Sequence, residues 1–234
     1  MGERTYYYCM AELQYFGHSF FKLKDGSETI LIDPVFNTPK TVATKQQKIP
    51  VKKEDLKNIS MILITNELEE HCDKAAIESI AKRENALVLA HDFILQDLDL
   101  SRNQKISVSP NSELFLKGFK IKTAIAHNPK SFCPTGYIIE KGGKSLYHAG
   151  TTRLIDSFSS IKADTIILPV SSHTMDVVDV VRAAKIMKPK TLIPMQHDIF
   201  EIQKQDVKDL DKRIKESVLN TKTVLLTPGR KIRL

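Results

Sequence analysis

One segment in the first third of the chain constrains the fold more than any other. Met61 to Ile64 is a short apolar run of the kind that forms a buried strand. A polar, acidic turn follows it, and from Asp73 to Lys82 the apolar residues recur at helical spacing. A strand that leads through a polar turn into a helix is typical of folds that pack helices against a sheet.

Length and composition predict an ordinary globular protein. The 234 residues are 41% hydrophobic and 27% charged, so the chain is long enough for one domain spanning residues 1–234. The formal charge of +7 comes from 35 basic and 28 acidic residues, but the lysines are scattered and no basic stripe is interleaved with aromatics. No apolar run approaches the length of a membrane span, so we expect no membrane partner.

The cysteines indicate a reducing environment. Cys9, Cys72 and Cys133 are odd in number and have no paired spacing, which does not suit a disulfide framework. The N-terminal residues lack the apolar run of a secretory signal. We therefore expect a cytoplasmic protein.

Strands dominate the first two thirds of the chain, and strands and helices alternate in the last third. Asn37 to Asp55, rich in Lys, Gln, Thr and Pro, is predicted to be a long surface loop, a flap or an inserted arm. Two mixed sheets with helices outside them follow from this order. The further predicted strands are 13–16, 19–23, 29–32, 86–90, 106–108, 112–116, 119–126, 136–140, 145–148, 165–170, 191–195 and 222–226, and the further helices are 175–187 and 203–218.

Six short motifs occur in a fixed order along the chain. They are Phe16-Gly17-His18-Ser19, Ile30-Leu31-Ile32-Asp33-Pro34, Gly136-Tyr137-Ile138-Ile139-Glu140, Leu146-Tyr147-His148-Ala149-Gly150-Thr151-Thr152, Leu168-Pro169-Val170 with Thr174-Met175-Asp176, and Leu192-Ile193-Pro194-Met195-Gln196-His197. Together with the turn after Ile64 they resemble the metallo-β-lactamase superfamily, in particular the branch of the ascorbate-6-phosphate lactonase and many uncharacterised metal-dependent hydrolases. The resemblance implies an α/β (α+β) fold, a four-layer αββα sandwich.

The same resemblance implies where two metal ions would bind. The T-H-x-H-x-D-H signature of that superfamily aligns with Thr65 to His71, of which only Thr65 and His71 match. His127 falls at a third histidine. The departures are Asn66 and Leu68 at the first two histidines, Glu70 at the aspartate, Thr151 at the bridging aspartate and Gln196 at the closing histidine.

This inventory is poor for a metal centre. A catalytic zinc site needs three protein ligands, whereas Leu68 has no lone pair and Gln196 offers only a neutral amide. Loss of the bridge at Thr151 makes a dinuclear centre improbable. We expect no cofactor, or at most one zinc or other divalent ion at the vestigial ligands Glu70, His71 and His127, with Cys72 or His197 as conceivable additions.

The catalytic candidates are His18, Asp33 and Glu70. His18 and Asp33 lie on motifs that the resemblance places beside the metal site. We expect Glu70 to face the pocket and to be hydrogen-bonded by His71, His127 or Thr151. Glu67 and Glu69 should point to solvent or to a lysine, and Asp73 should cap a helix.

Three functional hypotheses remain. The first is a non-catalytic protein, a pseudoenzyme, that binds a small molecule or a protein partner; the sequence leaves open whether it forms an oligomer. The alternative is a divergent metal-dependent hydrolase of esters, lactones or phosphodiesters that uses at most one metal. A nucleic-acid-associated protein is the weaker third hypothesis, because only the net charge and nuclease branches of the superfamily suggest it.

Overall fold

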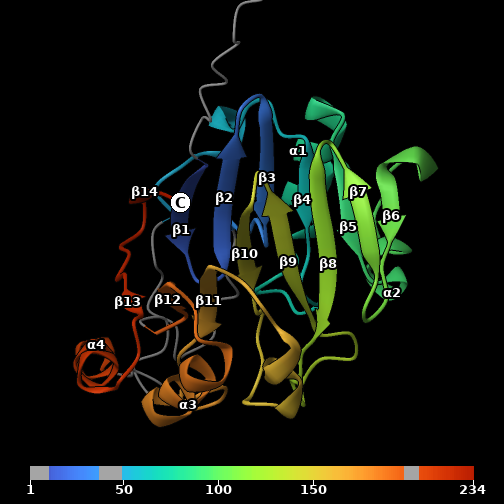
Figure 1. Ribbon diagram of the computed structural model, residues 1–234. Helices are drawn as coiled ribbons and strands as arrows, with labels where there is room; N and C mark the ends of the chain where they lie inside the picture. Colours follow the sequence, from blue (N-terminus) through green and yellow to red (C-terminus); the bar gives the residue numbers. More distant parts are fainter. Residues whose placement is uncertain (1–10, 37–48, 198–205) are drawn as a thin grey trace, which may run out of the picture.

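Two mixed β-sheets pack face to face in the computed structural model, which describes residues 11–36, 49–197 and 206–234 (Figure 1). Within these residues each sheet has seven strands, in the orders β14-β1-β2-β3-β4-β5-β6 and β13-β12-β11-β10-β9-β8-β7. The first sheet contains β1 (Glu12–Gly17), β2 (Phe20–Asp25), β3 (Glu28–Ile32), β4 (Met61–Leu63), β5 (Leu87–Ala90), β6 (Lys105–Ser107) and β14 (Lys231–Arg233). The second contains β7 (Glu113–Leu116), β8 (Phe119–Ile125), β9 (Thr135–Lys141), β10 (Lys144–His148), β11 (Thr165–Pro169), β12 (Thr191–Met195) and β13 (Lys222–Thr223).

The central strands are apolar on both faces because both faces are covered. In β3, Ile30 and Ile32 enter the core between the sheets, whereas Leu31 packs on the outer face. In β11, Ile167 faces the same core and Ile166 packs outward. Successive side chains of a strand alternate between faces, so a continuous apolar run fills two layers at once.

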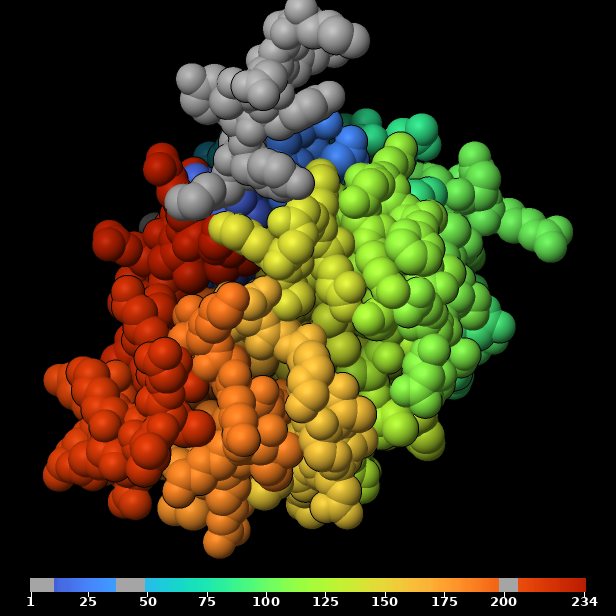
Figure 2. Space-filling model, viewed as in Figure 1, coloured from blue at the N-terminus to red at the C-terminus, as the bar shows by residue number. Residues whose placement is uncertain are grey.

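Helices cover both outer faces. The first sheet carries α1 (Lys74–Glu84) and α2 (Asp92–Leu95), and the second carries α3 (Val177–Met187) and α4 (Val207–Glu216). Figure 2 shows α3 and α4 as orange and red surface at the lower left. The four-layer αββα sandwich is therefore confirmed.

Aspartates begin the longer helices, as we predicted for Asp73. The Asp73 side chain accepts from the Ala76 N–H at 3.1 Å. Asp176 accepts in the same way from the Asp179 N–H at 2.8 Å. Each cap pairs an amide that the first turn would otherwise leave free, a contribution of about 1 kcal/mol.

Most predicted elements agree with the structure within a few residues. The strand 191–195 and the hairpin turn between Lys141 and Lys144 are confirmed. The short elements α2 and β14 were not predicted, because a few residues carry no readable period. Residues 37–48 of the predicted long loop and residues 203–205 of the predicted last helix lie outside the described residues; Lys53–Asp55 form a 3₁₀ turn.

The parallel strands decide where a site can form. β3, β4, β5 and β6 run parallel, and so do β10, β11, β12 and β13. The loops after the carboxyl ends of parallel strands meet at one edge of a sheet, the usual place for a ligand. We call this edge the loop end and the opposite edge, which holds the β9–β10 hairpin, the turn end. No helix in the described ranges is long and apolar enough to span a membrane.

Candidate functional site

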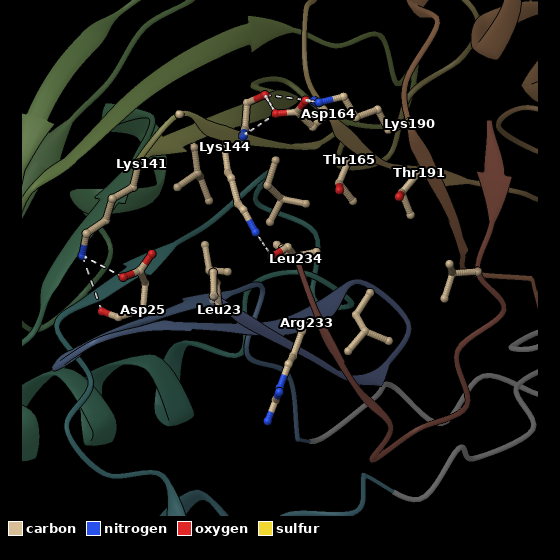
Figure 3. A pocket seen from close by; sticks show the side chains of 18 of the residues that line it. Leu23, Asp25, Lys141, Lys144, Asp164, Thr165, Lys190, Thr191, Arg233 and Leu234 are labelled. Atoms are coloured by element: carbon tan, nitrogen blue, oxygen red, sulfur yellow. Dashed lines mark hydrogen bonds and ion pairs between the residues drawn. The ribbon is translucent and has the colours of Figure 1, made fainter. Parts of the chain in front are cut away.

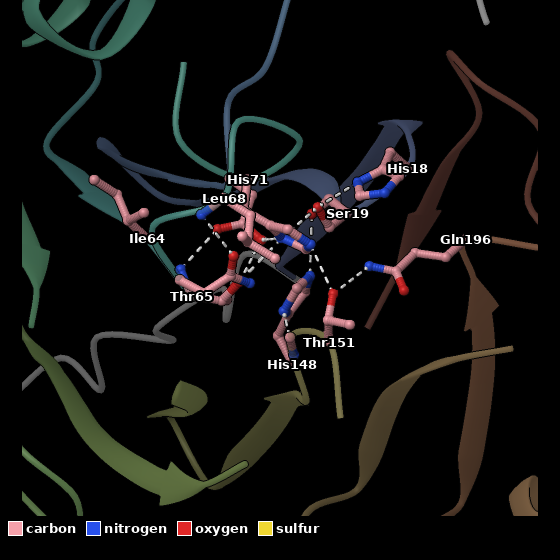
Figure 4. Close-up of polar contacts among 12 residues, drawn as sticks. His18, Ser19, Ile64, Thr65, Leu68, His71, His148, Thr151 and Gln196 are labelled. Atoms are coloured by element: carbon pink, nitrogen blue, oxygen red, sulfur yellow. Dashed lines mark hydrogen bonds and ion pairs between the residues drawn. The ribbon is translucent and has the colours of Figure 1, made fainter. Parts of the chain in front are cut away.

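A cavity of about 350 Å³ opens at the loop end. Six residues that the sequence singled out as site positions line it: His18, Leu68, Glu70, His71, Thr151 and Gln196. They come from the loops after β1, β4, β10 and β12, so both sheets contribute. Figure 4 shows His71 at the centre, with Thr65 to its left, Ser19 to its right and Thr151 below it.

Asp33 lies beneath the cavity, where it ends β3. Its carboxylate is fully buried. It accepts from the Thr65 N–H at 2.8 Å, from the Thr65 hydroxyl at 2.6 Å and from Nδ1 of His71 at 2.7 Å. A buried charge persists only when it is paired and hydrogen-bonded in this way.

The Asp33 contact fixes which nitrogen of His71 carries the proton. A carboxylate can only accept, so Nδ1 of His71 is the donor at 2.7 Å. Nε2 of the neutral ring then holds a lone pair, and it lies 2.6 Å from Oγ1 of Thr151. His71 is itself 1% exposed. The ring is thus held as a base whose free nitrogen faces a hydroxyl on the cavity wall.

Thr151 and Gln196 complete the row of polar groups. The Gln196 amide donates to Oγ1 of Thr151 at 2.9 Å. Because this amide nitrogen can only donate, the Thr151 oxygen accepts there and its own proton is free to point at Nε2 of His71. Gly150, before Thr151, has a φ of +63°, and a Cβ there would meet the Thr135 carbonyl oxygen and Cβ of Thr65 at 2.9 Å each. The close approach of the two loops therefore requires glycine.

A second layer of histidines surrounds His71. Ser19 connects them, because its Oγ lies 2.9 Å from Nδ1 of His18 and 3.1 Å from Nδ1 of His71. Nε2 of His148 donates to the Ser19 carbonyl at 3.1 Å, and its Nδ1 accepts from the Gly150 N–H at 3.2 Å. Burial lowers the pKa of His148 to about 4 and lowers that of His18 well below its ordinary value. Both rings are neutral at neutral pH.

Three site residues have left-handed backbone. The φ angles are +52° at His18, +47° at Asp33 and +65° at Gln196. Such a conformation costs a non-glycine residue about 1–3 kcal/mol and persists where the surroundings enforce it, often at functional sites. Each of the three follows the end of a strand. The sheets therefore hold these residues in an unfavourable backbone conformation that positions their side chains.

The turn after β4 is closed by its own side chains. Asn66 Oδ1 accepts from the Leu68 N–H at 3.0 Å, and the Leu68 carbonyl accepts from the His71 and Cys72 N–H groups at 2.8 Å each. Asn66 is fully buried, and the Leu68 side chain lines the cavity. Both residues therefore build the turn that presents His71.

The acidic residues of this turn depart partly from expectation. Glu70 lines the cavity as predicted, but among the described residues its carboxylate makes no hydrogen bond to His71, His127 or Thr151, because Thr151 pairs with His71 and Gln196 instead. The prediction that Glu67 points to solvent or a lysine is wrong. Burial would raise its pKa, but hydrogen bonds from the Phe132 N–H at 2.7 Å and the Ser131 hydroxyl at 2.7 Å hold that pKa below its ordinary value.

The remaining suggested ligands lie away from the cavity. The His127 side chain is exposed and does not line it, although the His127 N–H donates to Thr152 Oγ1 at 2.9 Å. Cys72 packs in the apolar layer outside the first sheet, where burial raises the pKa of its thiol to about 12. His197 is buried and also does not line the cavity.

These side chains do not fit the metal centre that the family resemblance implies. In residues 11–36, 49–197 and 206–234, no group of three or more His, Cys, Asp or Glu side chains is placed to hold a metal ion. His18, Glu70, His71 and His173 line the cavity, but no three of these described side chains lie close enough together to hold one ion, whereas a catalytic zinc site needs three protein ligands. Both nitrogens of His71 are also engaged, by Asp33 and Thr151.

The rim of the cavity holds residues that sequence reasoning missed. Lys130 and Arg153 line it, and no ion pair joins either to another described residue. On the loop before α3, Ser171 and Thr174 share a hydrogen bond of 2.9 Å. Thr174 belongs to a motif, but Lys130, Arg153 and Ser171 do not, because loops bring them to the cavity only in the folded chain.

A larger cavity of about 780 Å³ lies at the turn end (Figure 3). Apolar side chains such as Leu23 and Phe119 line part of it. Lys141 pairs with Asp25 at 3.3 Å, and Lys190 pairs with Asp164 at 2.7 Å. Lys222 and Arg233 also line it, and neither forms an ion pair with another described residue, so its charges are only partly paired.

Comparisons with known proteins agree with the fold and extend to function. The model of the beta-lactamase superfamily domain matches residues 12–196. A UPF0173 metal-dependent hydrolase of Staphylothermus marinus is 33% identical over 242 residues, which cover 94% of this chain and 97% of that protein. Another, of Aeropyrum pernix, is 28% identical with coverage of 94% and 96%.

Solved structures give the same picture. Igni18, a metallo hydrolase of Ignicoccus hospitalis, has a TM-score of 0.80 at 26% identity and covers 96% of this chain and 98% of its own. The metallo-beta-lactamase fold protein YhfI of Bacillus subtilis has a TM-score of 0.72 at 15% identity, with coverage of 95% and 99%, which supports the fold alone.

These relatives correct our first functional hypothesis. The interpretation as a non-catalytic pseudoenzyme is contradicted, because proteins similar over nearly the whole chain are named metal-dependent hydrolases. That hypothesis took the substituted ligands as loss of chemistry. It overlooked that Asp33, His71 and Thr151 form a hydrogen-bonded row in the absence of those ligands.

Proposed function

This chain belongs to the beta-lactamase superfamily, among the UPF0173 metal-dependent hydrolases, and we propose that it hydrolyses an ester, lactone or phosphodiester bound in the loop-end cavity. One observation supports this most directly. His71 is held by Asp33 at 2.7 Å with its second nitrogen facing the cavity wall. An imidazole oriented by a buried carboxylate is the usual general base of a hydrolase.

The chain's own residues perform the following tasks in this proposal. Asp33 orients the ring and stabilises the imidazolium that forms when His71 takes a proton. Oγ1 of Thr65 and Oγ of Ser19 lie 3.2 and 3.1 Å from Nδ1 of His71, and these contacts hold the orientation of the ring. General base catalysis of this kind contributes about 10²–10⁴-fold to a rate.

Family membership implies a divalent metal cofactor. Such an ion would supply a water of lowered pKa. No three donor side chains of the described residues gather around one point of the cavity, and both nitrogens of His71 are already engaged, so we propose at most one divalent ion per chain.

The rim indicates the charge of the substrate. Lys130 and Arg153 line the cavity, and Glu70 is the single acidic residue that lines it in the part of the chain that the structure describes. Cations around a cleft raise the local concentration of anionic ligands. An ester or lactone that carries a carboxylate or phosphate group is therefore the preferred substrate.

A substrate panel tests the proposal. Purified protein would be assayed on p-nitrophenyl acetate, on an aliphatic lactone and on bis-p-nitrophenyl phosphate, after dialysis against chelator and after loading with zinc or manganese. We expect hydrolysis of at least one class, and metal analysis should give no more than one ion per chain. Failure to hydrolyse any of the three under either condition would refute the hydrolase; two bound ions per chain would refute the metal stoichiometry.

A further inference from the structure

We propose that Asp33, His71 and Thr151 form an acid–base–nucleophile triad, in which the Thr151 hydroxyl attacks the carbonyl carbon of an ester or lactone. The inference rests on the proposed hydrolase function and names the attacking atom and the substrate class. Thr151 stands where the family resemblance would have a metal-bridging aspartate, so a different group occupies the centre of the site.

The three groups meet the geometric requirement of an activated nucleophile. Oγ1 of Thr151 lies 2.6 Å from Nε2 of His71, and Nδ1 of His71 lies 2.7 Å from Asp33. Nucleophile and base within hydrogen-bond reach, with the base oriented by a third group, define this type of site. The order of the groups is also fixed electrostatically, because Asp33 accepts the Nδ1 proton and leaves Nε2 free.

Thr151 is placed to reach a substrate. It lines the cavity and is partly exposed, whereas Asp33 is fully buried and His71 is 1% exposed. Gln196 donates to Oγ1 from the side away from His71, so the hydroxyl proton is directed at the base (Figure 4). The amide of Gln196 has a second N–H, of the kind that stabilises an oxyanion.

The reaction balances without any further reactant except water. Oγ1 of Thr151 bonds to the carbonyl carbon while its proton passes to Nε2 of His71. The bond from that carbon to the alkoxy oxygen breaks, and the leaving alkoxide takes the proton from His71. Water then attacks the acyl-threonine, gives a proton to His71, and the threonine oxygen leaves with that proton, which yields the acid and the original enzyme.

Covalent capture tests the triad on the full chain. Protein dialysed against chelator would be mixed with p-nitrophenyl acetate, and p-nitrophenolate release would be followed together with peptide mass spectrometry. We expect a burst of about one equivalent of p-nitrophenolate and an acetyl group on Thr151. Thr151→Ser should keep the burst, because it keeps the hydroxyl, and Thr151→Val should abolish it.

Two further variants separate chemistry from folding. Asp33→Asn can donate to Nδ1 and so place the ring proton on Nε2; we expect a folded protein by circular dichroism with capture reduced at least about 10²-fold. Thr123→Val removes a buried hydroxyl from the same sheet, outside the site, and should leave capture unchanged.

The outcomes distinguish this proposal from the one it rests on. Steady hydrolysis that survives Thr151→Val, or acetylation confined to lysines, would overturn the triad and leave the hydrolase standing. Absence of hydrolysis in the unaltered protein, with and without added metal, would overturn the proposed function itself.

Discussion

The two ends of the sandwich hold cavities of opposite character. At the turn end the larger cavity, about 780 Å³, is lined by charged groups that are all partly or fully exposed. Some are paired, such as Lys141 with Asp25, and others, such as Arg233, have no ion pair among the described residues. At the loop end the smaller cavity, about 350 Å³, lies over the buried pair of Asp33 and His71, and its cations are unpaired among the described residues. Volume is therefore a poor guide to function here, whereas buried polar groups that point at a cavity are a good one.

The contrast also concerns backbone conformation. At the turn end the left-handed residues of the hairpin are Gly142 and Gly143, which adopt that conformation without strain. Lys117 and Lys188 at the turn end also adopt it, but with exposed side chains. At the loop end His18, Asp33 and Gln196 adopt it with side chains that are buried. The loop end thus gives up backbone energy to position side chains, and substitutions there should have larger effects than substitutions at the turn end.

The largest expected effect is that of His71→Ala on turnover. Removal of the base should lower kcat/KM by about 10²–10⁴-fold on any substrate that the protein hydrolyses. His91→Ala, which removes a histidine at the start of α2, is the matched control and should change the rate little. Equal activity in the two variants would mean that the loop end is not the reaction centre.

Asp33→Ala should have the largest effect on stability. It removes the acceptor for two donors of Thr65 and for Nδ1 of His71 in a fully buried site. Breaking a buried pair by deleting one partner costs about 3–5 kcal/mol. Denaturant titration gives the free energy of unfolding of the variant and of the unaltered protein. A difference below about 1 kcal/mol would show that the hydrogen bonds of Asp33 contribute little to stability.

Acidification should destabilise the loop end through His148. Its pKa is about 4 in the folded protein, against about 6.5 unfolded, so below about pH 6.5 the unfolded chain binds the proton first. Stability is therefore fully present above that pH and falls by about 3 kcal/mol as the pH drops toward 4. His148→Gln should flatten the decline between about pH 6.5 and 5; an unchanged slope would assign it to other groups.

Lys141→Met at the turn end should have a small effect. Lys141 pairs with Asp25 and lies 4.3 Å from the centre of the Phe119 ring, but both charged side chains are partly exposed. Such contacts contribute about 1 kcal/mol or less, and part of the stem's packing is kept by methionine. The variant should turn over substrate at the rate of the unaltered protein. If it loses activity, the reaction takes place in the turn-end cavity.

Much of this contrast could be read from the sequence, but not its chemistry. Continuous apolar runs around Ile30 and Ile62 and the helical pattern around Val180 predicted the layers, because burial on both faces of a strand, or on one face of a helix, imposes these patterns. The motifs also predicted that His18, His71 and Thr151 meet at one edge. The pairing of Thr151 with His71 could not be predicted, since it depends on distances of a few tenths of an ångström between loops 80 residues apart.

Glu70→Gln should have the smallest effect. Among residues 11–36, 49–197 and 206–234, Glu70 is the only acidic residue on the wall of the loop-end cavity. Glu70 is half-buried, and among the described residues no salt bridge holds its carboxylate. Gln has nearly the same size, so the free energy of unfolding should change by no more than about 0.5 kcal/mol. Metal content, measured on the same preparation, sharpens the test. If the variant loses both stability and a bound ion, Glu70 is a working ligand, and the cavity would hold its metal at Glu70 and His71 instead of presenting Thr151 to the substrate.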